Sequence, residues 1–117
     1  MIYKIGTIAD LNSLPLLDDT TLELLYHHAS VLTTEYGANR NVDEDDGGFV
    51  LFAPPGTSNK DIKAFFDISE HTLEYVNTYG SLCEAVYLTN NDFAVVIVMS
   101  IADAPTEIRN EIDWIWR

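Results

Sequence analysis

The densest group of side chains able to do chemistry is an acidic loop with the sequence Asn41-Val-Asp43-Glu44-Asp45-Asp46-Gly47-Gly48. A hard cation such as Ca²⁺ prefers oxygen ligands at alternating loop positions and a glycine at the turn, and Asn41, Asp43 and Asp45 have that spacing. An EF-hand is excluded, because Asp46 stands at the glycine position and Phe52 at the position of the bidentate glutamate. The loop is therefore either an irregular cation site or a solvated acidic surface, and we expect no resident metal.

The histidines suggest a second kind of chemistry. Glu23 and His27 are four residues apart, so on a helix they share a face and form a carboxylate–imidazole pair or two metal ligands. A zinc site needs a third and a fourth ligand. His71 is the only histidine outside the His27-His28 pair, and nothing near it in the sequence completes the set. The pattern favours surface histidines beside a carboxylate.

Two further groups resemble reactive or ligand-binding sites only in part. Cys83 with His71 would make a nucleophile and a base, but no spacing supports that pairing. A lone cysteine in a strand is typical of a small buried apolar residue. The segment 53–60 (Ala-Pro-Pro-Gly-Thr-Ser-Asn-Lys) joins a strand to a helix start and offers donors to an anion, but it lacks the Walker spacing. Ordinary helix capping explains Ser58, and we expect no catalytic residues and no cofactor.

These side chains must be positioned by an α+β fold. A strand is expected over residues 1–9, and a helix over residues 20–36 with a stripe formed by Leu22, Leu25, Ala29, Leu32 and Tyr36. Thr20 with Glu23 predicts a capping box, and Gly37 predicts the end of the helix. Residues 10–19 and 38–46 read as loops.

The second half of the chain is mainly strand. Strands are expected over residues 48–53, 72–79, 82–89 and 92–101, with a short helix from Ser58 to Phe66 and a hairpin turn at Asn90-Asn91. Residues 93–99 are apolar on both faces, which indicates a central strand. A last helix begins near residues 103–105, and its stripe is Ile108, Ile112 and Ile115. The order β-α-β-α-β-β-β-α predicts one domain, residues 1–117, with a mostly antiparallel sheet of about five strands and two or three helices.

Charge limits the classes of partner. The 117 residues hold 19 acidic and 6 basic side chains, a formal net charge of -13. Residues 5–39 carry five acids and residues 64–108 carry seven, and neither stretch has a Lys or Arg. Direct nucleic-acid binding and binding to anionic membranes need clusters of Lys or Arg, so both are disfavoured. One cysteine excludes an internal disulfide, and the protein is expected in the cytoplasm.

Function is therefore expected from binding and not from catalysis. The leading hypothesis is a non-enzymatic acidic module that binds or inhibits a basic protein, as immunity proteins, antitoxins and DNA mimics do. Its expected partner-binding residues are Asp18, Asp19, Asp43, Glu44, Asp45 and Asp46. The alternative is that the acidic residues only keep the protein soluble.

Two other hypotheses stay open. One is a small enzyme or ligand-binding domain with a pocket between sheet and helices, lined by Tyr26, His27, Tyr75 and Tyr79. The other is a homodimer formed through the C-terminal helix, with Trp114 and Trp116, or through the apolar strand 93–99.

Overall fold

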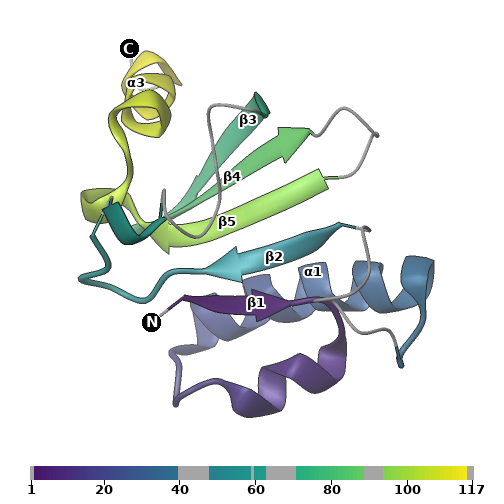
Figure 1. Cartoon of the computed structure of the whole chain (residues 1–117). Helices are drawn as coiled ribbons and strands as arrows, with labels where there is room; N and C mark the ends of the chain where they lie inside the picture. The colour runs from purple at the N-terminus through teal and green to yellow at the C-terminus, as the bar shows by residue number, and fades with distance from the viewer. Residues whose placement is uncertain (1, 40–47, 59, 63–70, 89–93, 116–117) are drawn as a thin grey trace.

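The computed structural model describes residues 2–39, 48–58, 60–62, 71–88 and 94–115, with side chains described as far as residue 112. The elements in chain order are β1 Tyr3–Ile5, the 3-10 helix η1 Ile8–Ser13, α1 Asp19–Tyr36, β2 Phe49–Phe52, β3 Thr72–Tyr79, β4 Leu82–Leu88, β5 Ala94–Ser100, the 3-10 helix η3 Ile101–Asp103 and α3 Thr106–Ile115 (Figure 1). Residues 60–62 are also helical. The fold is α+β, as expected from the order of the elements.

The five strands form one sheet in the order β1-β2-β5-β4-β3. Three of the four pairings are antiparallel, and β2 pairs with β5 in parallel. The β3–β4 hairpin is formed between β2 and β5 in the chain, and β5 then returns beside β2. The parallel pair matters for the site, because the carboxyl ends of β2 and β5 reach the same edge of the sheet.

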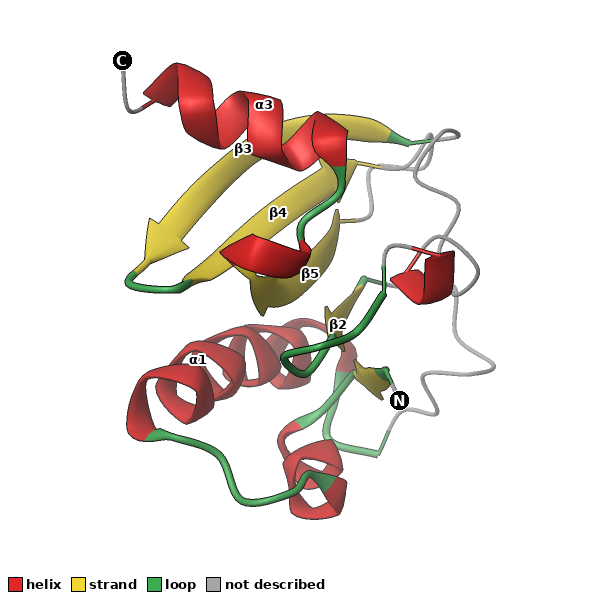
Figure 2. Cartoon of the chain, turned by 90° about the vertical axis from the view of Figure 1, so that its left-hand side faces the viewer, coloured by secondary structure: helices red, strands yellow, loops and turns green. Residues whose placement is uncertain are grey.

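The sheet lies between two helical layers, with α1 and η1 on one face and α3 on the other (Figure 2). Alternate residues of β5 supply the two cores: Val96 and Val98 join the α1 side, and Val95, Ile97 and Met99 join the α3 side. All five side chains are at most 7% exposed. The expectation of a central strand is confirmed for residues 94–99, and both faces are buried within one chain.

Helix α1 is turned slightly from the expected orientation. Its buried residues are Thr21, Leu25 and Ala29, whereas Leu22 is 44% exposed. The expected capping box of Thr20 with Glu23 is wrong, because the N-cap is Asp18, two residues earlier. Aspartate is a better N-cap than threonine, and Thr20 is already the second residue of the helix, so the Asp18 carboxylate accepts the free N–H group of the first turn. The helix ends as expected at Gly37, with φ of +95°.

The two helices cover the sheet unevenly. Helix α1 packs chiefly over β2, and α3 packs over β3 on the opposite face (Figure 2). The residues of β3 that share a face with Glu84 of β4 are therefore exposed: Tyr75 is 48% exposed, Tyr79 is 40% exposed, and Asn77 lies on the surface between them. This open part of the sheet, beside α1, borders the site described below.

Several expected boundaries change. The first strand ends at Ile5, and the expected loop over residues 10–19 begins with η1, which starts where the Asp10 carboxylate accepts the backbone N–H groups of Gly6 and Thr7. Ser58 caps the short helix as expected, since its hydroxyl accepts the Asp61 N–H at 3.1 Å. The turn at Asn90-Asn91 lies outside the described residues. No helix in the described part of the chain is long and apolar enough to cross a membrane.

Candidate functional site

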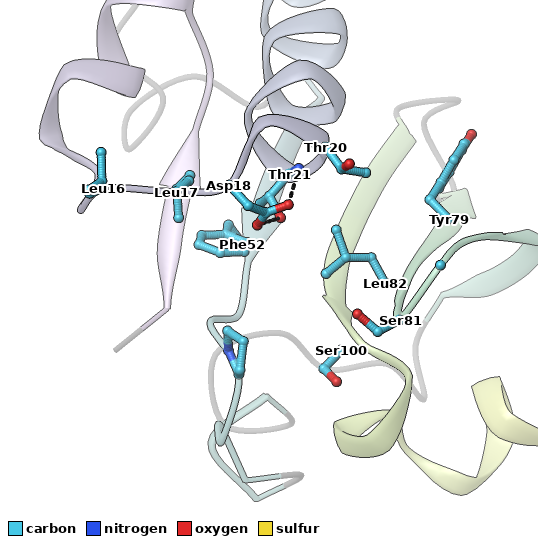
Figure 3. A pocket seen from close by; sticks show the side chains of 12 residues that line it. Leu16, Leu17, Asp18, Thr20, Thr21, Phe52, Tyr79, Ser81, Leu82 and Ser100 are labelled. Carbon is cyan, nitrogen blue, oxygen red and sulfur yellow. Dashed lines mark hydrogen bonds between the residues drawn. The ribbon is translucent and has the colours of Figure 1, made fainter.

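A cleft of about 530 Å³ opens where α1 begins and the β3–β4 hairpin turns (Figure 3). Its lining comes from five places in the chain: the loop before α1, the first turn of α1, the end of β2 with Pro55, the hairpin, and the end of β5. The lining residues are Leu16, Leu17, Asp18, Thr20, Thr21, Phe52, Pro55, Tyr79, Gly80, Ser81, Leu82 and Ser100.

The topology brings these segments together. Phe52 is the last residue of β2 and Ser100 the last of β5, and the parallel pairing places both at one edge of the sheet. Helix α1 starts at the same edge, because it runs back across the sheet before β2 begins. Ligand sites in sheets with parallel strands commonly lie outside the carboxyl ends of those strands. The cleft lies in that position.

Among the described residues that line the cleft, Asp18 alone carries a formal charge. Its Oδ1 accepts the Thr21 hydroxyl at 2.6 Å, and its Oδ2 accepts the Thr21 N–H at 3.2 Å. These two hydrogen bonds lower the pKa of the Asp18 carboxyl below its usual value of 3.8, and the bond from the Thr21 hydroxyl has the larger effect. The carboxylate is exposed, ionised at neutral pH and held in one orientation.

The rest of the cleft is an apolar floor with a polar rim. Phe52 is 1% exposed and Leu82 is 8% exposed, and Figure 3 shows Leu82 between Asp18 on one side and Tyr79 on the other. Thr20, Ser81 and Ser100 add hydroxyls that both donate and accept. Leu16 stands on the loop at one end of the cleft and is fully exposed.

Glu84, one strand in from the edge, is a charged residue that the sequence analysis did not single out as a site. It is 4% exposed, and its carboxylate has three side-chain partners: His28 Nε2 at 2.5 Å from Oε2, Asn77 Nδ2 at 2.9 Å and Tyr79 OH at 3.2 Å, both from Oε1. Burial raises the pKa of Glu84, but the hydrogen bonds from Asn77, His28 and Tyr79 outweigh it, so the pKa is lowered overall. Glu84 is an ionised carboxylate inside the sheet.

This hydrogen-bonded group connects three elements and reaches the cleft. His28 belongs to α1, Glu84 to β4, and Asn77 with Tyr79 to β3. Because the Tyr79 hydroxyl donates to Glu84, the ring that lines the cleft is fixed from behind. Burial, and then the Glu84 charge, raise the pKa of Tyr79, so the phenol stays protonated. A sequence signal for this group existed: Glu84 is acidic in an alternating row with Leu82 and Val86, where a sheet face normally continues apolar.

The layer formed by η1 and α1 has acidic residues without any Lys or Arg. Its acids are Asp10, Asp18, Asp19, Glu23 and Glu35. Among the described residues the Lys and Arg side chains are Lys4, Lys60 and Arg109. The Lys4 ammonium lies 4.4 Å from the centre of the Phe49 ring, which packs on the α3-side core, and Arg109 is on α3. The cleft therefore lies in an environment dominated by negative charge.

The structure separates the expected partner-binding residues. Asp18 and Asp19 are exposed at the start of α1, and only Asp18 lines the cleft. The acidic loop residues Asp43, Glu44, Asp45 and Asp46 lie outside the described residues, so their part in the site stays a prediction. Trp116, and the side chain of Trp114, also lie outside, and a dimer through them stays a prediction.

The pocket expected between Tyr26, His27, Tyr75 and Tyr79 is not formed as one unit. Tyr79 lines the cleft, whereas Tyr26 and His27 border a separate hollow on the outer face of α1 with Leu22 and Glu23. Tyr26 is 53% exposed. Of these four side chains, only Tyr79 of β3 is among the described residues that line the cleft.

Cys83 and His71 are not brought together. Cys83 is fully buried in the α3-side core, and its neighbour across the β3–β4 pair is Thr78. His71 lies just before Thr72, at the other end of β3, which puts it about 20 Å along the strand from Thr78. Burial raises the pKa of the Cys83 thiol to about 11. No group of three or more His, Cys, Asp or Glu side chains placed to hold a metal occurs in the described part of the chain.

Comparison with known proteins gives no relative. No family model, no curated protein and no solved structure matches this chain.

Proposed function

We propose that this protein is an acidic protein-binding module of the cytoplasm, and that its target is a basic protein which it binds or inhibits. The observation that carries the proposal is the cleft itself. It has an apolar floor, the ionised Asp18 at its mouth and the fully exposed Leu16 at its rim, and the described residues of its lining include no Lys or Arg. Immunity proteins, antitoxins and DNA mimics are classes that meet basic partners with acidic surfaces.

Exposed apolar side chains support a macromolecular target. Leu16 has its whole side chain in water, and Tyr79 on the other side of the cleft is 40% exposed. Single exposed apolar residues are ordinary on a protein surface, but here they flank a hollow with an apolar floor. Interfaces place aromatic and aliphatic anchors next to such hollows, with polar groups around them. A folded partner would cover Leu16, which a small ligand inside the cleft would leave exposed.

The charge pattern supports a basic target. Asp18, Asp19, Glu23 and Glu35 of α1 have no cation in their own layer, so their field is not cancelled locally. Such a field extends about 8 Å from the surface at physiological salt. It raises the encounter rate with a basic surface and repels acidic ones.

The proposal is tested by capture with matched baits, followed by binding of the purified target. Wild-type protein, Leu16→Ser and a control variant on α3, Glu111→Gln, are used to retain proteins from the host. The proposal expects a basic protein that the wild type and Glu111→Gln retain and Leu16→Ser loses. Its association rate should fall steeply between about 50 and 500 mM salt. A target of acidic character, or association that does not change with salt, would contradict it.

A second candidate function is binding of a small molecule, which the volume of the cleft favours. About 530 Å³ falls within the range of roughly 300–1,000 Å³ that is typical of ligand pockets. A thermal-shift screen with metal salts, nucleotides, small carboxylic acids and amines separates the two functions. A shift of several degrees with one compound, without any protein target, would favour the small-ligand function.

A further inference from the structure

We infer that the cleft is an anchor pocket for one arginine side chain of the basic target; this inference rests on the proposed function and names what its central site binds. The aliphatic part of the arginine would lie across Leu82, and its guanidinium would reach Asp18 and the hydroxyls of the rim. Three properties of the cleft support this choice of occupant: its charge, its floor and its rigidity.

The charge selects a cation. Two of the acceptor positions of the Asp18 carboxylate are used by the hydroxyl and the N–H of Thr21, and the remaining ones are available to a ligand. A helix N-terminus by itself favours anions, but here the Asp18 carboxylate already occupies the N-cap position. An anionic ligand would meet that charge at close range. A cation would find an oriented carboxylate and, in the part of the lining that the structure describes, no competing Lys or Arg.

The floor selects a guanidinium over an ammonium group. Phe52 and Leu82 are apolar and nearly fully buried, so a group that binds over them loses water on one side. A guanidinium is less strongly hydrated than an ammonium, so this loss is smaller for arginine. It also presents five N–H donors, and the lining offers oxygen acceptors besides Asp18, namely the hydroxyls of Thr20, Ser81 and Ser100.

The walls are held in place before any ligand binds. The orientation of Asp18 is fixed by Thr21, whose side chain is 3% exposed, and that of Tyr79 by its hydrogen bond to the buried Glu84. These supports come from α1 and β4, which are regular elements and not loops. A pocket that is already ordered loses less entropy on binding, which increases the affinity gained from each contact.

The first experiment uses three small probes and NMR spectra of the ¹⁵N-labelled protein. The probes are Nα-acetyl-arginine amide, Nα-acetyl-lysine amide and Nα-acetyl-citrulline amide, which is the neutral isostere of the arginine probe. We expect saturable shifts of the Thr21, Gly80 and Leu82 amides with the arginine probe, at a dissociation constant of about 1–10 mM. The lysine probe should bind several-fold more weakly, and citrulline should give no saturable shift. Equal binding of arginine and citrulline, or no shift at these amides, would overturn the inference.

The second experiment compares Asp18→Asn with Asp19→Asn. Both variants remove one negative charge from the same turn, and asparagine serves as an N-cap as well as aspartate, so Asp18→Asn keeps the helix start. Only Asp18 lines the cleft. We expect Asp18→Asn to weaken the arginine probe about tenfold or more, and Asp19→Asn to weaken it less than about twofold.

The two failures are distinguishable. If both variants weaken the arginine probe equally, only the general field acts and the anchor pocket is refuted, while salt-dependent binding of a basic target leaves the proposed function standing. If the probe binds in the cleft as expected but the captured target is acidic or binds independently of salt, the proposed function fails and the arginine site survives as a site for another guanidinium ligand.

Discussion

The buried pair His28–Glu84 makes a quantitative prediction about stability. In the variant His28→Leu the Glu84 carboxylate loses its closest partner while remaining almost without water, since its side chain is 5% exposed. A hydrogen bond to a charged group contributes about 1.5–3 kcal/mol, and an unpartnered buried acceptor adds to the loss. Asn77 and Tyr79 still donate to the other oxygen, so we expect the free energy of unfolding to fall by about 2–3 kcal/mol and not by more.

The double variant gives a different expectation. In His28→Leu with Glu84→Val the whole pair is replaced by apolar side chains beside Val86 and Val98, which already line this face. Replacing a buried ion pair by apolar residues is often neutral or stabilising. The single change Glu84→Val is expected to reduce stability by only about 1 kcal/mol, because His28, Asn77 and Tyr79 each retain access to water. The double variant should lie within about 1 kcal/mol of the wild type.

The assay is a double-mutant cycle by urea unfolding at pH 7, with thermal unfolding as a second measure. For 117 residues the unfolding entropy is about 0.25 kcal/mol per degree, so 2–3 kcal/mol lowers the midpoint by roughly 8–12 °C. With the double variant equal in stability to the wild type, the expected coupling energy between the two sites is about 3–4 kcal/mol. Additive effects, within about 0.5 kcal/mol, would refute the reasoning that the carboxylate depends on the imidazole.

Three further predictions concern other parts of the molecule. Because the pKa of Glu84 is lowered from 4.5 in the folded state, its charged form adds stability that is complete above pH 4.5 and is lost as the pH falls through the lower folded value. The difference in unfolding free energy between wild type and Glu84→Gln, measured by urea titrations, should therefore shrink below pH 4.5. A difference that stays constant with pH would contradict this. Cys83, with a thiol pKa of about 11 and no exposed surface, should react with a thiol reagent at pH 8 only at the rate of unfolding, so rapid labelling of the native protein would contradict its position in the α3-side core. Gly48→Ala should lower the free energy of unfolding by about 1–3 kcal/mol in chemical denaturation, since the new methyl carbon would lie 2.7 Å from the backbone oxygen of Ala94. Gly56→Ala is the matched control: no atom lies within 4 Å of its new methyl carbon, so it tests only the backbone strain that its φ of +90° causes.

Local patterns predicted the elements well because local physics forms them. The strand over residues 72–79 has the expected bounds, and α1 ends at the expected glycine with positive φ. The apolar run 93–99 identified the central strand because residues buried on both faces are apolar at every position. The helix start was misplaced by two residues, because Asp18 and Thr20 are both good caps and the choice between them depends on which turn packs on the sheet.

The candidate site was only partly predictable. The sequence analysis identified Asp18 by its charge and Tyr79 as an aromatic residue of a possible pocket. It did not predict that these two residues line the same cleft. Their meeting depends on the parallel pairing of β2 with β5, which brings the start of α1 and the hairpin to one edge. No property of residues 49–52 or 94–100 specifies that pairing over an antiparallel one.

By itself the sequence determined the class of fold, the central strand and the excess of acids over bases in residues 5–39. These follow from side-chain polarity and its period along the chain, which are local properties. Only the tertiary structure decided that the cation-free segment forms one helical layer, that Glu84 is buried against His28, and that Asp18 stands at the mouth of a cleft with an apolar floor. The physical reason is that burial, pairing and the field at a site depend on distances between segments far apart in the chain, and packing sets those distances.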